Sequence, residues 1–374
     1  MADGPRPPGP HRPGTPADRP RPSSPHRTFT APHPPPAGVR RRLRTPPRVP
    51  AVRGAPTPLH REPSTDGMSM SKQIRGVLPV VLMPYTDTGE IDEEDFLSQA
   101  DHIFGAGCDG LVVGQMSELL RLTHAERLRV AELCAKSVQG RGISVMSTGA
   151  ETAEAAVEYS RHAEAAGVDA LLVMHPATMA LGDEEMVDYY SRVVEAVTVP
   201  VIVHHAKSLA KTPLSIEAQA RLLRRYGDDR VMFKPEAQPT PPRVSLLRDA
   251  TGGRARIFEG DGGMMLLDCH RRGLAGTIPA TETAEIVGTL WRLLESGDRE
   301  SAERIGYPLS YLMCHMMNST DYYLSIAKRF LKERGIVKNT LVRGPSRHVL
   351  DDESWSEVDR LYTHLLHLSK ELSR

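Results

Sequence analysis

Short apolar runs recur along the chain from residue 71 onward, and longer mixed segments separate them. Each run is continuously apolar instead of alternating with polar residues, which is typical of parallel strands covered on their outer face by helices. The pattern therefore predicts eight parallel strands. They cover residues 77–83, 110–113, 143–147, 170–174, 200–203, 231–233, 255–258 and 274–278.

The segments between these runs carry apolar residues at helical spacing. Phe96, Ala100 and Ile103 form one such stripe, and Thr123 followed by Glu126 has the pattern of a helix capping box. Eight strand and helix units within about 220 residues indicate a closed barrel. We therefore predict an α/β fold, a (β/α)₈ TIM barrel that spans residues 71–296.

Strand patterns stop at about residue 296, and amphipathic helical patterns follow. They predict a C-terminal helical extension over residues 297–374, which is a candidate for contacts in an oligomer. The three expected helices cover residues 298–318, 321–335 and 352–372. An apolar stripe in the first of them is expected to pack in the core rather than to hold a cofactor. The stripe consists of Tyr307, Leu309, Leu312, Met313 and Met316.

The first 70 residues differ in composition from the rest of the chain. Residues 1–67 hold 19 of the 31 prolines, 12 arginines, no lysine and four acidic residues, so the zero net charge of the chain hides a basic leader and an acidic remainder. Such a segment buries too little apolar surface to offset its conformational entropy, which predicts a disordered leader over residues 1–70. Targeting or nucleic-acid binding are alternatives. We favour a dispensable leader or an upstream start codon, because Met68 and Met70 directly precede the first ordered pattern.

Cysteine spacing and hydropathy indicate the cellular compartment of the protein. Cys108, Cys134, Cys269 and Cys314 lie far apart without metal-binding spacing, and we expect buried thiols in a reducing cytoplasm. No stretch approaches the roughly 18 to 20 apolar residues that a membrane-spanning helix needs. The expected localisation is therefore cytoplasmic, without a membrane partner.

Reactive residues are expected at the C-terminal ends of the barrel strands, because active sites of this fold are built there. Lys234 ends the apolar run 231–233, where an unpaired ammonium is poorly solvated and a neutral, nucleophilic amine is favoured. Position alone leaves open the alternative that Lys234 is a surface lysine with a buried stem.

Residues 74–296 resemble the dihydrodipicolinate synthase and N-acetylneuraminate lyase family. The matching motifs, in order, are Gly76-Val77 with Met83-Pro84-Tyr85, the run at 107–114, Glu118 with Leu122-Thr123, and Gly140-Arg141. The resemblance implies a (β/α)₈ barrel, a homo-oligomer (dimer or tetramer) and a 2-oxo acid substrate. It also implies that Lys234 forms the Schiff base, with no other cofactor.

The chain departs from the family at the residues around this lysine. The family's Gly-Thr-Thr-Gly-Glu loop reads Gly-Gln-Met-Ser-Glu at 114–118, and its relay of one threonine and two tyrosines falls on Gln115, Thr178 and His204. Backbone amides and Ser117 remain able to bind a carboxylate. The expected substrate-binding residues are Gln115, Met116, Ser117, Thr178, Gly260, Asp261 and Thr277.

His204 and Glu236 are the candidate acid–base groups beside Lys234. A histidine transfers protons at neutral pH more readily than a phenol, and Glu236 lies two residues after Lys234 and so on the same strand face. Alternatively, His204 is a packed imidazole and Glu236 only an ion-pair partner. His205 points to the opposite side and is expected to be structural.

The expected function is a Schiff-base lyase that dehydrates or cleaves a 2-keto-3-deoxy-type acid, since the residues near 234, 260 and 276–279 look more like the sugar-acid dehydratase branch. One alternative is condensation of pyruvate with an aldehyde. Another is a catalytically silent barrel with a binding or regulatory role, although nucleic acid is not the expected partner. No metal-binding motif accompanies the two adjacent histidines, so no metal is expected.

Overall fold

The computed structural model describes residues 4, 72–206, 213–348 and 350–373. The chain divides into two units, Met1–Gly67 and Met68–Arg374, and the fold belongs to the second. Apart from Gly4, the predicted leader 1–70 lies outside the described residues. Within the described ranges, no helix is both long and apolar enough to cross a membrane.

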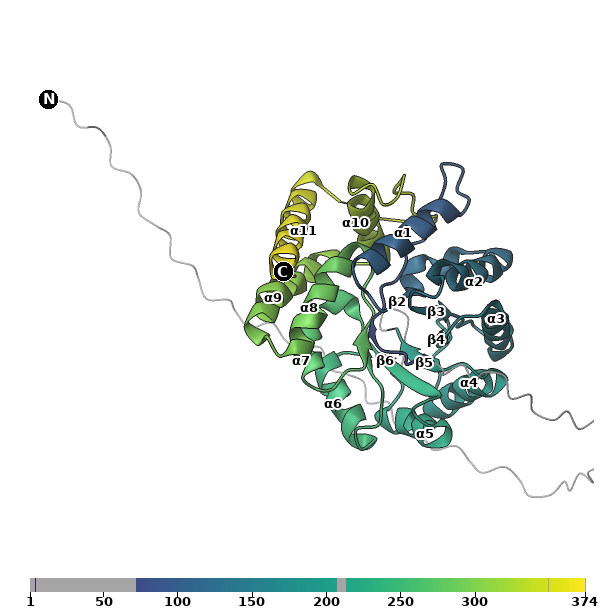
Figure 1. Ribbon diagram of the computed structural model, residues 1–374. Coiled ribbons are helices and arrows are strands. Elements are labelled where there is room, and N and C mark those ends of the chain that lie inside the picture. Colours follow the sequence, from purple (N-terminus) through teal and green to yellow (C-terminus); the bar gives the residue numbers. More distant parts are fainter. Residues whose placement is uncertain (1–3, 5–71, 207–212, 349, 374) are drawn as a thin grey trace, which may run out of the picture. The chain divides into compact units, whose positions relative to one another are not determined.

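The eight predicted strands are present, and they close into a (β/α)₈ barrel (Figure 1). Parallel strands β2 to β6 form one sheet in chain order, and β1, β8 and β7 form a second. The pairs Val80–Val112 and Phe233–Ile257 join the two sheets at both seams. The strands are β1 (Gly76–Val77), β2 (Gly110–Val113), β3 (Ile143–Ser147), β4 (Ala170–Met174), β5 (Val201–His205), β6 (Val231–Pro235), β7 (Phe258–Glu259) and β8 (Gly276–Thr277).

The first strand is much shorter than the predicted run 77–83. Pro79 has no amide hydrogen, so it interrupts the hydrogen-bond pattern of a regular strand. The backbone nevertheless stays in place, because Leu78 N donates to Thr277 O (3.0 Å) and Val81 N donates to Val112 O (2.9 Å). The prediction was therefore right about the position and wrong about the length of regular pairing.

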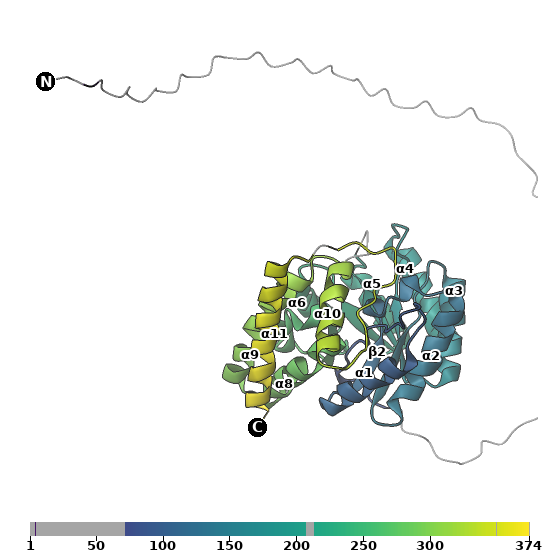
Figure 2. The same cartoon turned by 90° about the horizontal axis from the view of Figure 1, so that it is seen from above.

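Helices surround the barrel, as the view from above shows (Figure 2). The predicted capping box is confirmed, because Glu126 N donates to Thr123 Oγ1 and Thr123 N donates to Glu126 Oε2. The helices of the barrel are α1 (Glu93–Gly105), α2 (His124–Val138), α3 (Ala153–Ala166), α4 (Asp183–Ala196), α5 (Ile216–Tyr226), α6 (Thr240–Ala250), α7 (Leu266–His270) and α8 (Ala284–Ser296). Short 3₁₀ turns η1 (Gln115–Ser117), η2 (Leu119–Arg121), η3 (Asp261–Gly263) and η4 (Thr281–Thr283) follow strands β2, β7 and β8.

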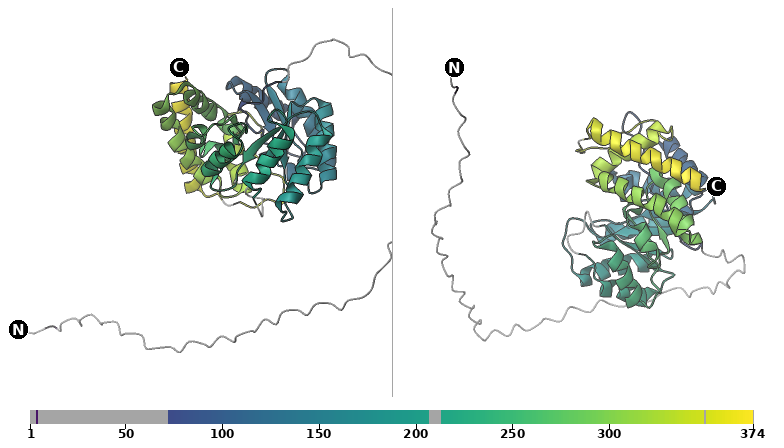
Figure 3. Two further views of the ribbon diagram at one scale, coloured as in Figure 1. Left: turned by 90° about the horizontal axis from the view of Figure 1, so that it is seen from below. Right: turned by 90° about the vertical axis from the view of Figure 1, so that its left-hand side faces the viewer.

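Three further helices follow, namely α9 (Arg299–Met316), α10 (Thr320–Glu333) and α11 (Asp352–Leu372) (Figure 3). Helices α9 and α11 pack beside α8, and α10 packs against α9 and η4. They match the three predicted segments and belong to the same compact unit as the barrel, so the division at residue 296 stays a prediction. Four residues of the predicted stripe, Leu309, Leu312, Met313 and Met316, are buried. Tyr307 is 61% exposed, so its assignment to the core was wrong. The rotation of the helix carries position 307 to the outer face.

The cysteines are free thiols, and three of them are buried as expected. Cys314 is exposed on α9, which corrects the prediction that all four are buried. It follows the buried Met313 by one residue, a step of about 100° around the helix.

Candidate active site

Lys234, Glu236 and His204 meet at the C-terminal ends of two adjacent strands. The parallel register sets His204 of β5 beside Lys234 of β6. Lys234 Nζ lies 3.2 Å from His204 Nε2 and forms an ion pair with Glu236 Oε1, while Glu236 Oε2 lies 3.1 Å from His204 Nε2. All three side chains are nearly buried, with exposed fractions of 7%, 11% and 3% for Lys234, Glu236 and His204. The structure thus brings together the three residues that were predicted to be catalytic.

The charges of this trio favour a neutral imidazole beside an ionised carboxylate. Burial, and then the nearby Lys234, lower the pKa of His204. Burial by itself raises the pKa of Glu236, but the opposing attraction of Lys234 and His204 holds that pKa well below its usual range. A base and a proton carrier are therefore in contact with one primary amine.

One ring nitrogen of His204, Nε2, lies near two partners that require different protonation states of it. To bond to Glu236, Nε2 must carry a hydrogen; to accept a hydrogen from Lys234, it must be bare. The other ring nitrogen, Nδ1, is buried without a partner among the described residues. Because neither tautomer satisfies both contacts, Nε2 of His204 can hydrogen-bond to only one of its two partners at a time.

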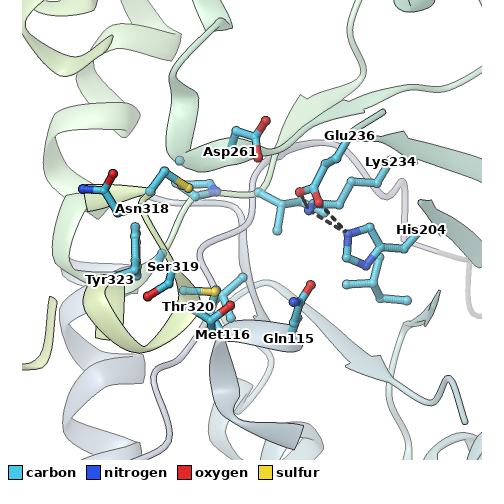
Figure 4. A pocket seen from close by; sticks show the side chains of 18 residues that line it. Gln115, Met116, His204, Lys234, Glu236, Asp261, Asn318, Ser319, Thr320 and Tyr323 are labelled. Atoms are coloured by element: carbon cyan, nitrogen blue, oxygen red, sulfur yellow. Dashed lines mark hydrogen bonds and ion pairs between the residues drawn. The ribbon is translucent and has the colours of Figure 1, made fainter. Parts of the chain in front are cut away.

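A cavity of about 190 Å³ opens above this trio. Lys234, Glu236 and His204 lie at one end of it, and Gln115, Met116 and Asp261 line its sides (Figure 4). The opposite end is lined by residues 317–320, between α9 and α10, and by Tyr323 of α10. The predicted binding residues Gln115, Met116 and Asp261 are thus at the cavity.

Ser117 belongs to the same loop but takes a different position. Its hydroxyl donates to Val81 O (2.5 Å) and accepts from Gly114 N (3.0 Å), and its side chain is fully buried. Ser117 does not line the cavity, so it holds the loop against the backbone after β1. The backbone amides of this loop remain the predicted anion donors, because successive amides at a strand-to-loop turn can form an anion nest.

Gly260 lies against the catalytic pair without contributing a side chain. A Cβ atom at this position would overlap the Glu236 carboxylate and lie 2.8 Å from Lys234 Nζ. The backbone of Gly260 has a φ of −116°, so a left-handed backbone is not what requires a glycine here. The absence of a side chain therefore allows Glu236 and Lys234 to lie close to the backbone of Gly260.

Thr178 and Thr277, also predicted to bind substrate, do not line the cavity. Thr178 follows β4, and its backbone amide and hydroxyl both donate to Glu151. Thr277 is fully buried and donates to Glu259 Oε2 (2.7 Å). Since alternate residues of a strand face opposite sides, Ile278 lines the cavity and Thr277 points outward.

The far wall of the cavity was not foreseen from the sequence. Residues 317–320 form the turn into α10, where Ser319 caps the helix by accepting from Tyr322 N (3.1 Å). A capping pattern predicts where a helix starts. It carries no information about which strand ends that helix covers.

Among the described residues, no group of three or more histidine, cysteine, aspartate or glutamate side chains is arranged to hold a metal ion. His175 and His205 have ring centroids 5.4 Å apart. Burial and the neighbouring His175 lower the pKa of His205 to about 4. His205 therefore carries no charge at neutral pH, in agreement with a structural role.

A model of the dihydrodipicolinate synthetase family matches residues 73–364. The chain belongs to this family. The membership confirms the predicted resemblance and places the chain among aldolase- and lyase-type enzymes. A 4-hydroxy-tetrahydrodipicolinate synthase of Agrobacterium fabrum is 27% identical over 302 residues, which cover 78% of this chain and 98% of that protein. A second, from Phenylobacterium zucineum, is 35% identical over 149 residues, or 40% of this chain and 50% of that protein.

Solved structures of the family share the fold. The 4-hydroxy-tetrahydrodipicolinate synthase of Methylacidiphilum fumariolicum aligns with a TM-score of 0.74 at 22% identity, over 80% of this chain and 99% of that one. YagE of Escherichia coli, solved in complex with pyruvate, aligns with a TM-score of 0.71 at 20% identity, over 79% and 99%. At this level of identity the likeness establishes the barrel and its C-terminal helices, and the chemistry must be argued from the site.

Proposed function

We propose that this protein is a Schiff-base lyase that acts on a 2-oxo acid through Lys234. The observation that carries the proposal is the position of Lys234 Nζ, which lies at the end of the cavity in contact with both Glu236 and His204. Family membership and the pyruvate bound to YagE support the same class of substrate. No cofactor besides the lysine is needed, because the iminium itself withdraws electrons.

The trio supplies each proton transfer of this chemistry. His204 takes a proton from Lys234, and the neutral amine attacks C2 of the acid. The carbinolamine then loses its hydroxyl as water, using the proton held by His204, and becomes an iminium. Glu236 or His204 removes a proton from C3 to give an enamine. The enamine expels the C4 hydroxyl, which takes up the returned proton and leaves as water. A second water then hydrolyses the remaining iminium, which releases the unsaturated 2-oxo acid and restores Lys234.

We favour this dehydration of a 2-keto-3-deoxy acid over cleavage of the C3–C4 bond. The two relay tyrosines of the family are replaced by Thr178, which is outside the cavity, and by His204, which is in contact with the lysine. The acid–base groups His204 and Glu236 therefore lie in contact with the amine that forms the imine. Cleavage remains available to the same iminium and would release an aldehyde and the enamine of pyruvate.

Reductive trapping tests the proposal directly. Incubation with pyruvate and sodium borohydride is expected to add the mass of a reduced pyruvate adduct to the peptide that contains Lys234. Lys234→Arg keeps a cation beside the buried Glu236 but cannot form an imine, so this variant is expected to fold and to remain unlabelled. A folded wild-type protein that gives no adduct with pyruvate or longer 2-oxo acids would overturn the proposal and favour a silent barrel.

The second candidate is condensation of pyruvate with an aldehyde, which the names of the curated relatives favour. The two reactions differ in stoichiometry. A synthase consumes pyruvate only when the aldehyde is present, whereas a dehydratase converts a single deoxy sugar acid without releasing pyruvate. Pyruvate consumption measured with and without added aldehyde separates them.

A further inference from the structure

The cavity has reactive groups at one end and a different set of polar groups at the other. Lys234, Glu236 and His204 occupy the first end, and Asn318 and Ser319 lie at the second (Figure 4). Most of the wall between them is apolar. Its apolar members are Val80, Met116, Leu172, Ile278, Pro279 and Ala280. A ligand that spans the cavity therefore meets polar partners only near its two ends and at Gln115 and Asp261 on the sides.

The far polar groups are neutral and retain hydrogen-bonding capacity. Ser319 Oγ accepts from Tyr322 N, which leaves its own hydrogen for another acceptor. Asn318 Nδ2 donates one hydrogen to His315 O (2.8 Å), and its amide has a second hydrogen and an acceptor oxygen. Neutral donors and acceptors of this kind can form hydrogen bonds with the hydroxyl groups of a ligand. A ligand with a second carboxylate or an ammonium group at this end would lack a charged partner among residues 317–320.

The size of the cavity also exceeds that of a three-carbon acid. One water-sized position takes roughly 10–15 Å³ of such space. The cavity volume of about 190 Å³ therefore holds on the order of a dozen non-hydrogen atoms. A five- or six-carbon acid with hydroxyl groups fills this space, whereas pyruvate leaves the far end empty.

Contacts with the barrel hold the far wall in place. Tyr323 donates its hydroxyl to the buried Glu282 of η4, and Arg121 of η2 forms an ion pair with Asp321. Arg347 N donates to the other oxygen of Asp321 (2.8 Å). The wall is thus ordered before a substrate binds, so little conformational entropy of the wall residues is lost on binding.

We propose that the 317–320 turn is the specificity wall of this enzyme and that Asn318 and Ser319 bind hydroxyl groups at the far end of a five- or six-carbon 2-keto-3-deoxy acid. This rests on the proposed function, because the carbonyl end of the substrate must be held at Lys234. It adds the substrate class and names the residues that select it.

The test compares how tightly two acids occupy the site before borohydride reduction. The acid concentration that gives half-maximal labelling of Lys234 is measured for pyruvate and for 2-keto-3-deoxygluconate. In the double variant Asn318→Ala/Ser319→Ala, this concentration is expected to rise about fivefold to tenfold for the deoxy sugar acid and to stay unchanged for pyruvate. Ser319→Thr, which keeps the hydroxyl, is expected to behave like wild type.

Ser215→Ala is the matched control, because Ser215 caps α5 in the same way by accepting from Ala218 N and does not line the cavity. It removes a helix cap without altering the wall. If wild type is labelled by neither acid, the proposed function fails and the wall proposal with it. If pyruvate labels Lys234 but the double variant changes both acids equally or neither, the wall proposal alone is overturned.

Discussion

At the scale of single residues, the site depends on a glycine as much as on its reactive side chains. Gly260→Ala places a methyl group where the Glu236 carboxylate lies and close to Lys234 Nζ, at a position where φ is not left-handed. We expect the rate of borohydride labelling to fall at least about tenfold, because a small displacement of reacting groups is costly, while the fold is retained.

The control is Gly105→Ala, at a position where an added Cβ meets nothing within 4 Å. It should leave both labelling and the melting temperature near wild type. Normal labelling in Gly260→Ala would show that the approach of Glu236 and Lys234 has no catalytic value.

His204 is expected to control the protonation of Lys234. His204→Asn keeps a polar side chain but cannot carry the proton, so labelling at pH 7 should slow by about a hundredfold. His205→Asn on the opposite strand face serves as the control and should be labelled at the wild-type rate. Equal labelling rates in His204→Asn and wild type would mean that His204 takes no part in the proton transfer.

At the scale of elements, the barrel loops and the C-terminal helices are joined by a buried ion pair. Lys328 of α10 donates to Glu118 Oε1 (2.5 Å), and the exposed fractions of the two side chains are 3% and 0%. Lys328→Met removes the nearer of two cations, since Arg121 Nη1 stays 3.4 Å from Glu118 Oε2, and should lower the free energy of unfolding by up to about 3–5 kcal/mol. Arg343 N also donates to Glu118 (2.9 Å), so part of the hydrogen bonding remains.

Urea unfolding of Lys328→Met, Glu118→Gln/Lys328→Met and wild type measures this effect. The double variant should recover much of the loss, because no uncompensated charge remains. Arg192→Ala breaks the ion pair with Glu154, in which the two side chains are 45% and 72% exposed, and should leave the free energy of unfolding close to that of wild type because solvent screens exposed pairs. Equal losses in Lys328→Met and Arg192→Ala would contradict the importance of burial.

Sequence reasoning succeeded where a local pattern determines position along a strand. Lys234 and His204 became candidates because each ends an apolar run, and the family resemblance then implied their roles. Thr277 shows the limit of this reasoning. An error of one residue in the position along a strand moves a side chain from the cavity to the outer face of the barrel. The short β8 and the tight turn at its end give no pattern that distinguishes Thr277 from Ile278.

The far wall marks a second limit, because it depends on contacts distant in sequence. Tyr323 reaches Glu282 across 41 residues, and Lys328 reaches Glu118 across 210. Helical spacing predicts α10 well. Its docking over the barrel is decided by pairs of charged and polar residues that each look like surface residues in the sequence.

At the scale of the whole molecule, two buried carboxyl groups link stability to pH. Burial raises the pKa of Glu259 from its ordinary 4.5 to about 8, despite the hydrogen bond from Thr277. Burial likewise raises the pKa of Glu282 to about 7, despite the hydrogen bond from Tyr323. Both groups hold their protons in the folded chain at pH values where the unfolded chain has already released them.

The sign of the effect follows from this difference in bound protons. At Glu259 and Glu282 the folded state binds more protons than the unfolded state between about pH 5 and pH 8, so the contribution of these two groups to stability falls as the pH rises. Each of the two groups changes the free energy of unfolding by at most about 1.4 kcal/mol per pH unit. The lowered pKa values of His204 and His205 act in the opposite direction below about pH 6.5, where imidazoles of the unfolded chain bind protons, so the loss of stability is expected between about pH 6.5 and pH 8.

Glu259→Gln isolates one contribution, because the amide is neutral at every pH and the Thr277 hydroxyl can rotate to bond it. Urea unfolding at pH 5, 6.5 and 8 should show a shallower loss of stability in this variant than in wild type. Glu184→Gln, at a side chain that is 78% exposed, should leave the slope unchanged. An identical slope in Glu259→Gln and wild type would mean that Glu259 is ionised in the folded protein. In that case a positively charged group on the outer side of β7 and β8 would have to stabilise the Glu259 carboxylate.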